Sequence, residues 1–535
     1  MSAARQQDPV EDEFAQVRRA LAPDPVDHDV IIVGAGFGGL GAAIACTRLG
    51  IEDFLILDRD DGVGGTWHTN TYPGAAVDIA SATYSYSFEP NPDWSRIYAP
   101  GAELKQYVDH VADTYDLRRH VRHHTTVTAA RWDELSQSWT LDIDGQAPLT
   151  ARIVIVATGI LSQPKTPTIP GLGDYQGTLI HASRWPKAAG LAGKRVAFIG
   201  TGATAVQAVP EVAATAAQVA VFQRTPIWVT PKPDLPIPPI VRGVFRRVPA
   251  TQRAARHVNG AFIEYIASGL MYFRQAPWIL KSLESVSKAH LRLQVTGPAI
   301  REALTPDYNF FCKRPTFSNP YFPAFNRDNV DLVTAPIDHI NSTGIVTEDG
   351  HARAFDVIVL ATGFKLQEEG NFPTFPIYGR DGVEQVAYWR EHGYESYDGI
   401  TVHGYPNMFG MNDPFSFTGL SFFYQAESQM AHISRVIGEL RKRHGVVFEV
   451  KPHAQRKFVA KMDSRAASTV WFRGSCATAN SYYFNAAGQT RLARLHPTAY
   501  VQWRSKHFPL SDYRFDTATD PLVRDAHRQA ATNAS

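Results

Sequence analysis

Cysteine is scarce in this sequence of 535 residues, which contains only Cys46, Cys312 and Cys476. The three stand far apart, without a CxxC pair and without the spacing of a metal site. Paired cysteines mark zinc sites and dithiol redox centres, so neither class is expected here. Isolated thiols also predict a reducing cytoplasm and no disulfide framework.

A charge excess and long hydrophobic runs are absent too. The chain has 53 Lys and Arg against 52 Asp and Glu, so its net charge of +1 favours neither nucleic acid nor an anionic membrane as the main partner. No stretch reaches the ~20 apolar residues of a membrane span. The best candidate, residues 260–273, contains Glu264 and predicts a buried helix. We therefore expect a cytoplasmic protein without a transmembrane segment.

A glycine-rich loop near the N-terminus predicts a first dinucleotide site. The apolar run 29–33 leads into Gly34-x-Gly36-x-x-Gly39, and an alanine-rich helix is expected to follow. These glycines permit a tight turn, the close approach of a pyrophosphate and the close packing of helix on strand. The next apolar run ends at Asp58, about twenty residues on, where an acid binds a ribose hydroxyl. Strand, loop, helix and acid together predict a Rossmann-like unit.

The segment after this unit suits a flat adenine dinucleotide. Thr66 and Trp67 close a Gly-Gly-Thr-Trp run, and a Tyr-Pro-Gly turn follows. Such turn-rich, aromatic sequence wraps a cofactor more readily than it builds a strand. Asp78 lies just beyond, and its residue type leaves two interpretations open: a functional acid, or a loop carboxylate that caps a helix.

A second glycine-rich loop lies about a third of the way along the chain. Residues 194–199 predict another buried strand, which leads into Gly200-x-Gly202, with Thr204 on the helix that opens there. A chain with two such loops is expected to hold two dinucleotides at once. The expected pair is a flavin that reacts and a nicotinamide that reduces it.

The end of the following strand indicates which nicotinamide binds. The strand at 218–222 is followed by Arg224 and Thr225, where an NAD-binding unit places a carboxylate. A guanidinium matches a 2′-phosphate bidentately, so NADPH is preferred over NADH. The alternative is that Arg224 is a solvated charge at a strand end.

Two further apolar runs, 153–159 and 357–363, each close on Ala-Thr-Gly. This repetition after each dinucleotide unit predicts the crossings of the chain between two nested domains. The predicted fold class is therefore α/β, with two nested Rossmann-like dinucleotide-binding domains.

The run between the two loops carries a family resemblance. Tyr175, Gly177, His181, Trp185 and Pro186 follow the pattern FxGxxxHxxxW with a final Pro or Asp, except that Tyr replaces Phe. With the two loops and the Ala-Thr-Gly turns, the sequence resembles the flavin-dependent Baeyer–Villiger monooxygenases, the class B flavoprotein monooxygenases. The resemblance covers about residues 29 to 365. It implies that the pattern acts as a hinge between domains and that His181 does no acid–base chemistry.

The resemblance also implies roles for other residues. The catalytic arginine falls on Arg314, with Asp78 as its partner, and Lys313 meets the 2′-phosphate of NADPH beside Arg224. Trp471 is expected near the nicotinamide ribose. Without the resemblance, Lys313 and Arg314 would be taken for a basic pair on the surface.

The activity implied is insertion of one oxygen atom from O2 beside the carbonyl of a small hydrophobic ketone, giving an ester or lactone through a C4a-peroxyflavin. FAD and NADPH are the expected cofactors, without a metal, and no nucleic-acid partner is expected. A fixed cation at Arg314 would stabilise the negative charge of that chemistry in a water-poor site.

The domain boundaries follow from these motifs. We expect an N-terminal extension at 1–28, a first FAD-binding part at 29–160, and an NADPH-binding domain at 161–354 with a helical insertion at about 232–308. Residues 355–535 would complete the FAD-binding domain and line the substrate pocket. Similar chains use the insertion to wall that pocket, and the molecule would be a monomer or a homodimer. Eight aromatic residues are candidates for the pocket, at least half of which should be core: Phe415, Phe417, Phe422, Phe423, Tyr424, Tyr482, Tyr483 and Phe484.

Other functions use the same layout. A class B enzyme that oxygenates amines or sulfides would not need Arg314, and an uncoupled NADPH oxidase would release peroxide without oxygenating anything. A disulfide reductase shares the two loops but needs the CxxC pair that is missing. A non-catalytic binding protein could use the fold as a scaffold.

Overall fold

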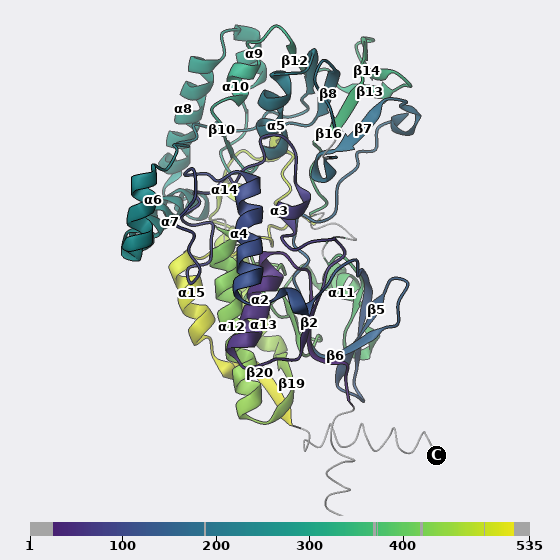
Figure 1. Cartoon of the computed structure of the whole chain (residues 1–535), viewed down its shortest axis with the longest axis vertical. Coiled ribbons are helices and arrows are strands. Elements are labelled where there is room, and N and C mark those ends of the chain that lie inside the picture. The colour runs from purple at the N-terminus through teal and green to yellow at the C-terminus, as the bar shows by residue number, and fades with distance from the viewer. Residues whose placement is uncertain are drawn as a thin grey trace, which may run out of the picture.

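The computed structural model describes residues 25–186, 189–366, 371, 373–417, 421–485 and 487–517. Two main β-sheets organise this part of the chain, one in the lower half of Figure 1 and one in the upper half. The predicted extension at 1–28 lies largely outside the described residues.

The lower sheet has eight strands in the order β17-β4-β5-β6-β1-β2-β3, with β18 paired to β6. Strands β6, β1, β2 and β3 are parallel, whereas β4, β5 and β6 form an antiparallel meander. Most positions of β1 and β6 are buried, as expected for parallel strands covered on both faces. The strands are β1 (His28–Val33), β2 (Phe54–Leu57), β3 (Val121–Arg122), β4 (Val127–Asp133), β5 (Ser138–Ile143), β6 (Leu149–Val156), β17 (Ile377–Tyr378) and β18 (Met408–Gly410).

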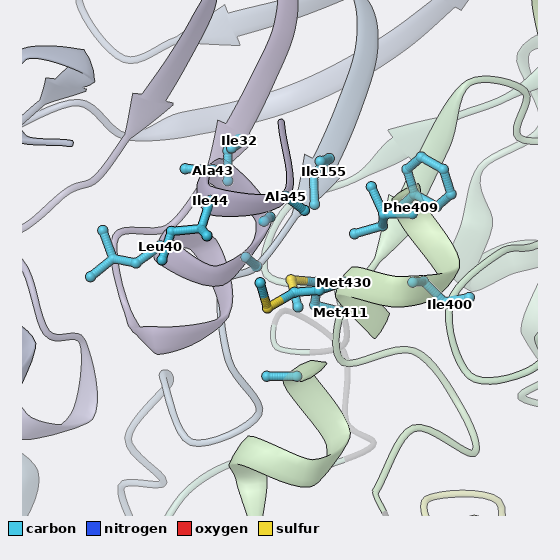
Figure 2. Close-up of a cluster of buried hydrophobic side chains, with 14 of the residues drawn as sticks. Ile32, Leu40, Ala43, Ile44, Ala45, Ile155, Ile400, Phe409, Met411 and Met430 are labelled. Carbon is cyan, nitrogen blue, oxygen red and sulfur yellow. The ribbon is translucent and has the colours of Figure 1, made fainter. Parts of the chain in front are cut away.

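Helix α2 (Phe37–Arg48) covers one face of this sheet and is itself covered by α12 (Phe422–Lys442). Figure 2 shows the resulting core, in which Ile32 of β1 and Ile44 of α2 lie in one buried cluster with Met430 of α12. Ten consecutive residues of α2, Phe37 to Cys46, are buried. This burial fixes the helix N-terminus, and with it the first glycine-rich loop, at the carboxyl end of the sheet.

The upper sheet has five strands, all parallel, in the order β12-β9-β8-β16-β7. Helix α5 (Ala203–Ala213) follows the second glycine-rich loop and packs on β9. A small antiparallel sheet of β13, β14 and β15 precedes β16. The strands are β7 (Thr178–His181), β8 (Arg195–Ile199), β9 (Gln218–Phe222), β12 (Val330–Val333), β13 (Ile337–Ile340), β14 (Gly344–Thr347), β15 (Ala352–Ala354) and β16 (Val357–Leu360).

Two connections run side by side between the sheets. Each follows an Ala-Thr-Gly turn, one after β6 and one after β16. The N–H of Lys165 donates to the carbonyl of Gly363 (2.9 Å), and the N–H of Lys365 donates to that of Gln163 (3.0 Å). The predicted crossing points are therefore confirmed, and so is the predicted α/β class with nested Rossmann-like units.

Four helices form the insertion in the upper domain, and each begins with proline at its first position. Proline suits this position because the N–H that it lacks has no partner in the helix. The prediction of a buried helix at 260–273 is only half right: Ile266 and Met271 are buried, but the side chain of Phe262 is 58% exposed. The helices are α6 (Pro239–Arg247), α7 (Pro249–Met271), α8 (Pro277–Gln294) and α9 (Pro298–Ala303).

The rest of the chain returns to the lower sheet and then passes back to the site. Helix α12 packs on both α2 and α15, and β19 pairs antiparallel with β20. Among the described residues, no helix combines the length and the apolar character needed to cross a membrane. The remaining elements are α3 (Thr66–Thr69), α4 (Gly101–Thr114), β10 (Val229–Thr230), β11 (Thr316–Phe317), α10 (Tyr321–Ala324), α11 (Gln385–His392), β19 (Gly445–Val450), α13 (Pro452–Ala466), α14 (Val470–Arg473), α15 (Thr498–His507) and β20 (Tyr513–Thr517).

Candidate active site

A hollow of about 1600 Å³ lies between the two glycine-rich loops. Residues of both domains and of the C-terminal segment line it. Gly39 and Trp471 are not among the described residues that line it. All the other residues predicted for the site line the hollow: Gly34, Gly36, Asp58, Thr66, Trp67, Asp78, Gly200, Gly202, Thr204, Arg224, Thr225, Lys313 and Arg314.

The first loop is built as a pyrophosphate cradle. Gly34 has a φ of +112°, and a Cβ there would lie 2.5 Å from the carbonyl oxygen of Ala157. A Cβ on Gly39 would lie 1.8 Å from the oxygen of Gly34, so this glycine serves the packing of helix on strand. Asp58 Oδ2 accepts from the N–H of Ala35 (2.5 Å), which ties the end of β2 to the loop. Burial raises the pKa of the Asp58 carboxyl.

The second loop repeats this construction. Gly200 has a φ of +111°, and a Cβ there would lie 2.6 Å from the carbonyl oxygen of Ala361. The N–H of Ala361 donates to Ile199 (2.9 Å), just as the N–H of Ala157 donates to Val33 (2.8 Å). The alanine of each Ala-Thr-Gly turn thus packs directly against the glycine-rich loop of the same domain. The repeated sequence therefore has a packing role as well as marking the crossings.

Two cations lie together at the second loop. Burial, with the nearby charge of Arg224, lowers the pKa of the Lys313 ammonium to about 8. When the Asn480 side-chain amide is oriented with its oxygen toward Arg224, the guanidinium donates to it through Nε (3.3 Å), so Arg224 has a neutral partner. Two neighbouring cations repel each other unless an anion binds between them. This arrangement fits a phosphate group.

Arg314 is half-buried and faces the hollow. Burial alone would lower the pKa of its guanidinium, but Tyr482, Tyr483 and Asp78 outweigh this effect and raise the pKa. The side chain of Tyr482 lies beside Arg314, whose charge opposes the rise in the Tyr482 pKa that burial causes. Arg314 therefore stays charged at any working pH.

Asp78 is held from the opposite domain. Gln207 of α5 donates to Asp78 Oδ1 (3.0 Å), while its own amide oxygen accepts from the hydroxyl of Tyr72 (2.8 Å). Burial raises the pKa of the Asp78 carboxyl, and the charges of Arg314 and Lys232 oppose that rise. Asp78 thus acts on Arg314 through its charge, while Gln207 fixes its position.

The motif between the loops lies at the domain boundary. His181 ends β7, directly beside Leu360 of β16, and its Nδ1 contacts the hydroxyl of Ser183 (2.8 Å). The carbonyl of Trp185 accepts from the hydroxyl of Thr71 in the other domain (3.0 Å). These contacts agree with a hinge. The hydroxyl that distinguishes Tyr175 from phenylalanine donates to the carbonyl of Phe355 (3.1 Å).

The cysteine prediction is wrong in one respect. Cys312 and Cys476 form a disulfide with a Cα–Cα distance of 5.1 Å, and the buried Cys46 remains free. Because 164 residues separate the two, no local spacing could reveal the pair. The disulfide ties the segment before Arg314 to the segment that carries Tyr482. The prediction of a reducing compartment rested on isolated thiols, so the disulfide removes its support.

Two residues near the hollow have contacts that the sequence did not predict. The indole N–H of Trp471 donates to the carbonyl of Phe311 (3.0 Å), behind Tyr483. Gln207 stands in an alanine-rich helix, where the sequence gives no signal of a role. Helices α6 to α9 contribute none of the described lining residues, so the prediction that they wall the hollow is wrong. Five of the eight aromatic candidates do line it: Phe417, Phe422, Tyr482, Tyr483 and Phe484.

Two dinucleotide cradles that face one hollow, with a half-buried arginine between them, define a flavoprotein oxidoreductase driven by a nicotinamide. Comparisons with known proteins narrow this class. The family model described as pyridine nucleotide-disulphide oxidoreductase matches residues 31–266. A Baeyer–Villiger monooxygenase of Streptomyces coelicolor is 36% identical, over 95% of each chain.

Solved structures agree. A steroid monooxygenase bound to NADP has a TM-score of 0.81 and 30% identity over 91% of this chain and 99% of that one. The OTEMO complex with FAD and NADP has a TM-score of 0.80 and 28% identity over 92% and 100%. The chain belongs to the Baeyer–Villiger monooxygenases. The predicted family, fold and class of enzyme are therefore confirmed.

Proposed function

We propose that this enzyme inserts one oxygen atom of O2 beside the carbonyl of an apolar ketone, with FAD in the lower domain and NADPH in the upper one. The observation that carries this proposal is the half-buried, charged Arg314, which faces the hollow between the two cradles. An enzyme that oxygenates amines or sulfides through a protonated oxidant has no need of such a cation.

The residues fit the two cofactors. The loop of Gly34 and Gly36, with Asp58 at the end of β2, suits the pyrophosphate and a ribose of FAD, and Thr66 and Trp67 lie beside it. Gly200, Gly202 and Thr204 suit the pyrophosphate of NADPH. Bound FAD, once reduced by NADPH, supplies the oxygen chemistry. We propose the domain division expected from the sequence, with 29–160 and 355–535 on the FAD side and 161–354 on the NADPH side.

Arg314 is the proposed catalytic residue. Its guanidinium would lie where negative charge develops on the oxidant and on the oxygen of the attacked carbonyl. A fixed, charged donor in a buried site stabilises such charge without reorganising. The negative charge of Asp78 stabilises the positive charge of Arg314. Gln207 holds Asp78 by a hydrogen bond, and Tyr482 lies beside Arg314.

Lys313, Arg224 and Thr225 are the proposed 2′-phosphate site. The neutral Asn480 partner of Arg224 can be exchanged for phosphate at little electrostatic cost. The place of Trp471 near the nicotinamide ribose stays a prediction, and its contact with Phe311 means that its indole would have to move.

The substrate side of the hollow is aromatic. Phe417, Phe422 and Tyr483 line it, which suits a small hydrophobic ketone. A monomeric or homodimeric state and a cytoplasmic location stay predictions from the sequence.

The test is the consumption of NADPH and O2 by the purified yellow protein, with and without cyclic, linear and aryl ketones. Products one oxygen heavier than the ketone, identified by mass spectrometry as esters or lactones, support the proposal. Oxidised amines or sulfides alone would favour the heteroatom oxygenase. Peroxide release at a rate independent of every substrate would favour the uncoupled oxidase.

A further inference from the structure

The helical insertion concentrates positive charge that the composition of the whole chain conceals. Between residues 239 and 294 there are nine cations, and the acids are Glu264 and Glu284. The whole chain has a net charge of only +1. The cations are Arg242, Arg246, Arg247, Arg253, Arg256, Arg274, Lys281, Lys288 and Arg292.

The same helices expose large apolar side chains. Helix α7 presents Val258 (70% exposed), Phe262 (58%) and Tyr265 (46%) at intervals of three or four residues, which places them on one face. Trp278 at the start of α8 is 57% exposed, and its ring lies 6.3 Å from that of Tyr265. Soluble proteins rarely expose such a continuous group without a partner.

Helix α6 extends this surface. Ile240 (77% exposed), Val244 (43%) and Val248 (48%) recur every four residues along it, and no residue of α6 is buried. Helix α6 packs on α7, and both lie at the left edge of the molecule in Figure 1. The opposite side of α7 is different, because Met271 packs into the buried cluster that contains Tyr308 and Trp471.

Several of the cations are available to an external partner. Arg247, Arg253 and Lys281 are exposed, and Arg247 and Lys281 each lie one helical turn from an exposed apolar residue, Val244 and Trp278. Arg246 is paired with Asp93, and Arg256 is buried against the carbonyl of Ser85 (2.6 Å). The surface therefore combines exposed aromatic and aliphatic groups with exposed, positively charged side chains.

We propose that the α6–α8 surface docks on an anionic lipid membrane, lying in the interface without crossing it. An amphipathic helix with basic residues and a Trp, Tyr and Phe face binds such a surface through apolar burial and charge together. A second copy of the chain is a poorer occupant, because a symmetric dimer through this face would oppose one cationic surface with another. Docking there would leave the hollow, which these helices do not line, free for its cofactors.

The test is vesicle flotation with the full-length, flavin-loaded protein. The probes are vesicles of phosphatidylcholine alone and vesicles with phosphatidylcholine and phosphatidylglycerol in equal amounts. We expect binding only to the second kind, lost in ~1 M salt, where exposed charges are screened. Equal binding to both kinds, or binding to neither, would overturn the proposal.

Matched variants locate the surface. Phe262→Ser should weaken binding by about tenfold, whereas Leu135→Ser, an exposed leucine (42%) on the β4–β5 hairpin, should not. Lys281→Glu, one turn from Trp278, should weaken it by at least about tenfold, whereas Arg119→Glu, exposed near β3, should not. NADPH oxidation should be unchanged in all four variants, which shows that they fold.

The variants also separate lipid from a second copy. If size-exclusion chromatography with light scattering shows a dimer that Phe262→Ser dissociates, this face is an interface between copies and the proposal is wrong. Vesicle binding that none of the variants alters would equally remove the assignment to α6–α8.

Discussion

The hydroxyl of Tyr482 lies beside the guanidinium of Arg314, although the two residues are far apart along the chain. The Cys312–Cys476 disulfide joins the two segments close to this contact. The proposed catalytic cation is therefore positioned by the C-terminal segment as well as by Asp78. The relationship predicts that this segment contributes to catalysis as well as to substrate choice.

Tyr482→Phe should lower kcat for the ketone by about tenfold, because it removes the hydroxyl beside the Arg314 guanidinium, and a polar partner of a charged group contributes about 1.5–3 kcal/mol. The Michaelis constant for NADPH should change little, since Tyr482 contacts Arg314 and not Arg224. Steady-state rates with both substrates varied would measure this. A variant that raises only the Michaelis constant for NADPH would contradict a positioning role. Phe472→Leu, a change at an exposed residue (46%) of a nearby segment that is not among the described lining residues, is the matched control.

Arg314→Ala should abolish ester formation while NADPH oxidation continues. Loss of one preorganised donor to a developing charge lowers kcat by about 10²–10³-fold. Arg314→Lys should recover little, because an ammonium cannot reproduce the guanidinium geometry. The measurement is the ratio of ester to NADPH consumed, by mass spectrometry and absorbance. An ester yield in Arg314→Ala close to that of the unmodified enzyme would remove Arg314 from its catalytic place.

Reduction of the disulfide should destabilise the protein. A cross-link across so long a loop contributes about 2–4 kcal/mol by restricting the unfolded chain. Dithiothreitol, or Cys476→Ser, should therefore lower the midpoint of thermal unfolding, followed by circular dichroism. Cys46→Ala is the control. Burial raises the pKa of the Cys46 thiol to about 12, so that residue is unreactive and the response to dithiothreitol should persist without it. An unchanged midpoint in Cys476→Ser would show that the cross-link contributes nothing.

Arg224→Ala should raise the Michaelis constant for NADPH by about ten- to a hundredfold, the value of a lost charge-assisted bond to phosphate. The constant for NADH should stay nearly unchanged because NADH lacks the 2′-phosphate. Asn480→Ala removes the neutral partner of Arg224 and serves as the comparison. Equal effects of Arg224→Ala on both nucleotides would exclude the assignment of the 2′-phosphate site.

The local parts of the fold could be predicted from the sequence, because local patterns encode them. Each glycine-rich loop stands between an apolar strand and a helix, so Gly34 and Gly200 could be placed without a structure. The packing of an Ala-Thr-Gly turn against each loop was not predictable. Ala157 and Ala361 lie against the loops because of the order of strands in each sheet, and this order cannot be derived from local sequence patterns.

The site was predictable in composition but not in its contacts. Arg314 and Asp78 could be nominated only through the family resemblance, since neither lies in a local pattern that marks a catalytic group. The contacts of Gln207 and Cys476 were not predicted because their partners are distant along the chain, and long-range pairing depends on packing. The cationic surface on α6–α8 was not predicted for another reason. The net charge of the whole chain is close to zero and conceals a local excess of positive charge.

Lys313 should make NADPH affinity depend on pH. Its ammonium has a pKa of about 8, below the ordinary lysine value, because burial and the charge of Arg224 disfavour the charged form. Below about pH 8 the charged side chain attracts the 2′-phosphate, and above it that attraction is lost. Between about pH 7 and about pH 9 the charged fraction of Lys313 falls about tenfold, so the Michaelis constant for NADPH should rise by up to about tenfold, while that for NADH stays flat. Lys313→Arg keeps its charge throughout this range, so it should remove the dependence. A parallel rise for NADH, or a rise that persists in Lys313→Arg, would assign the titration to another group.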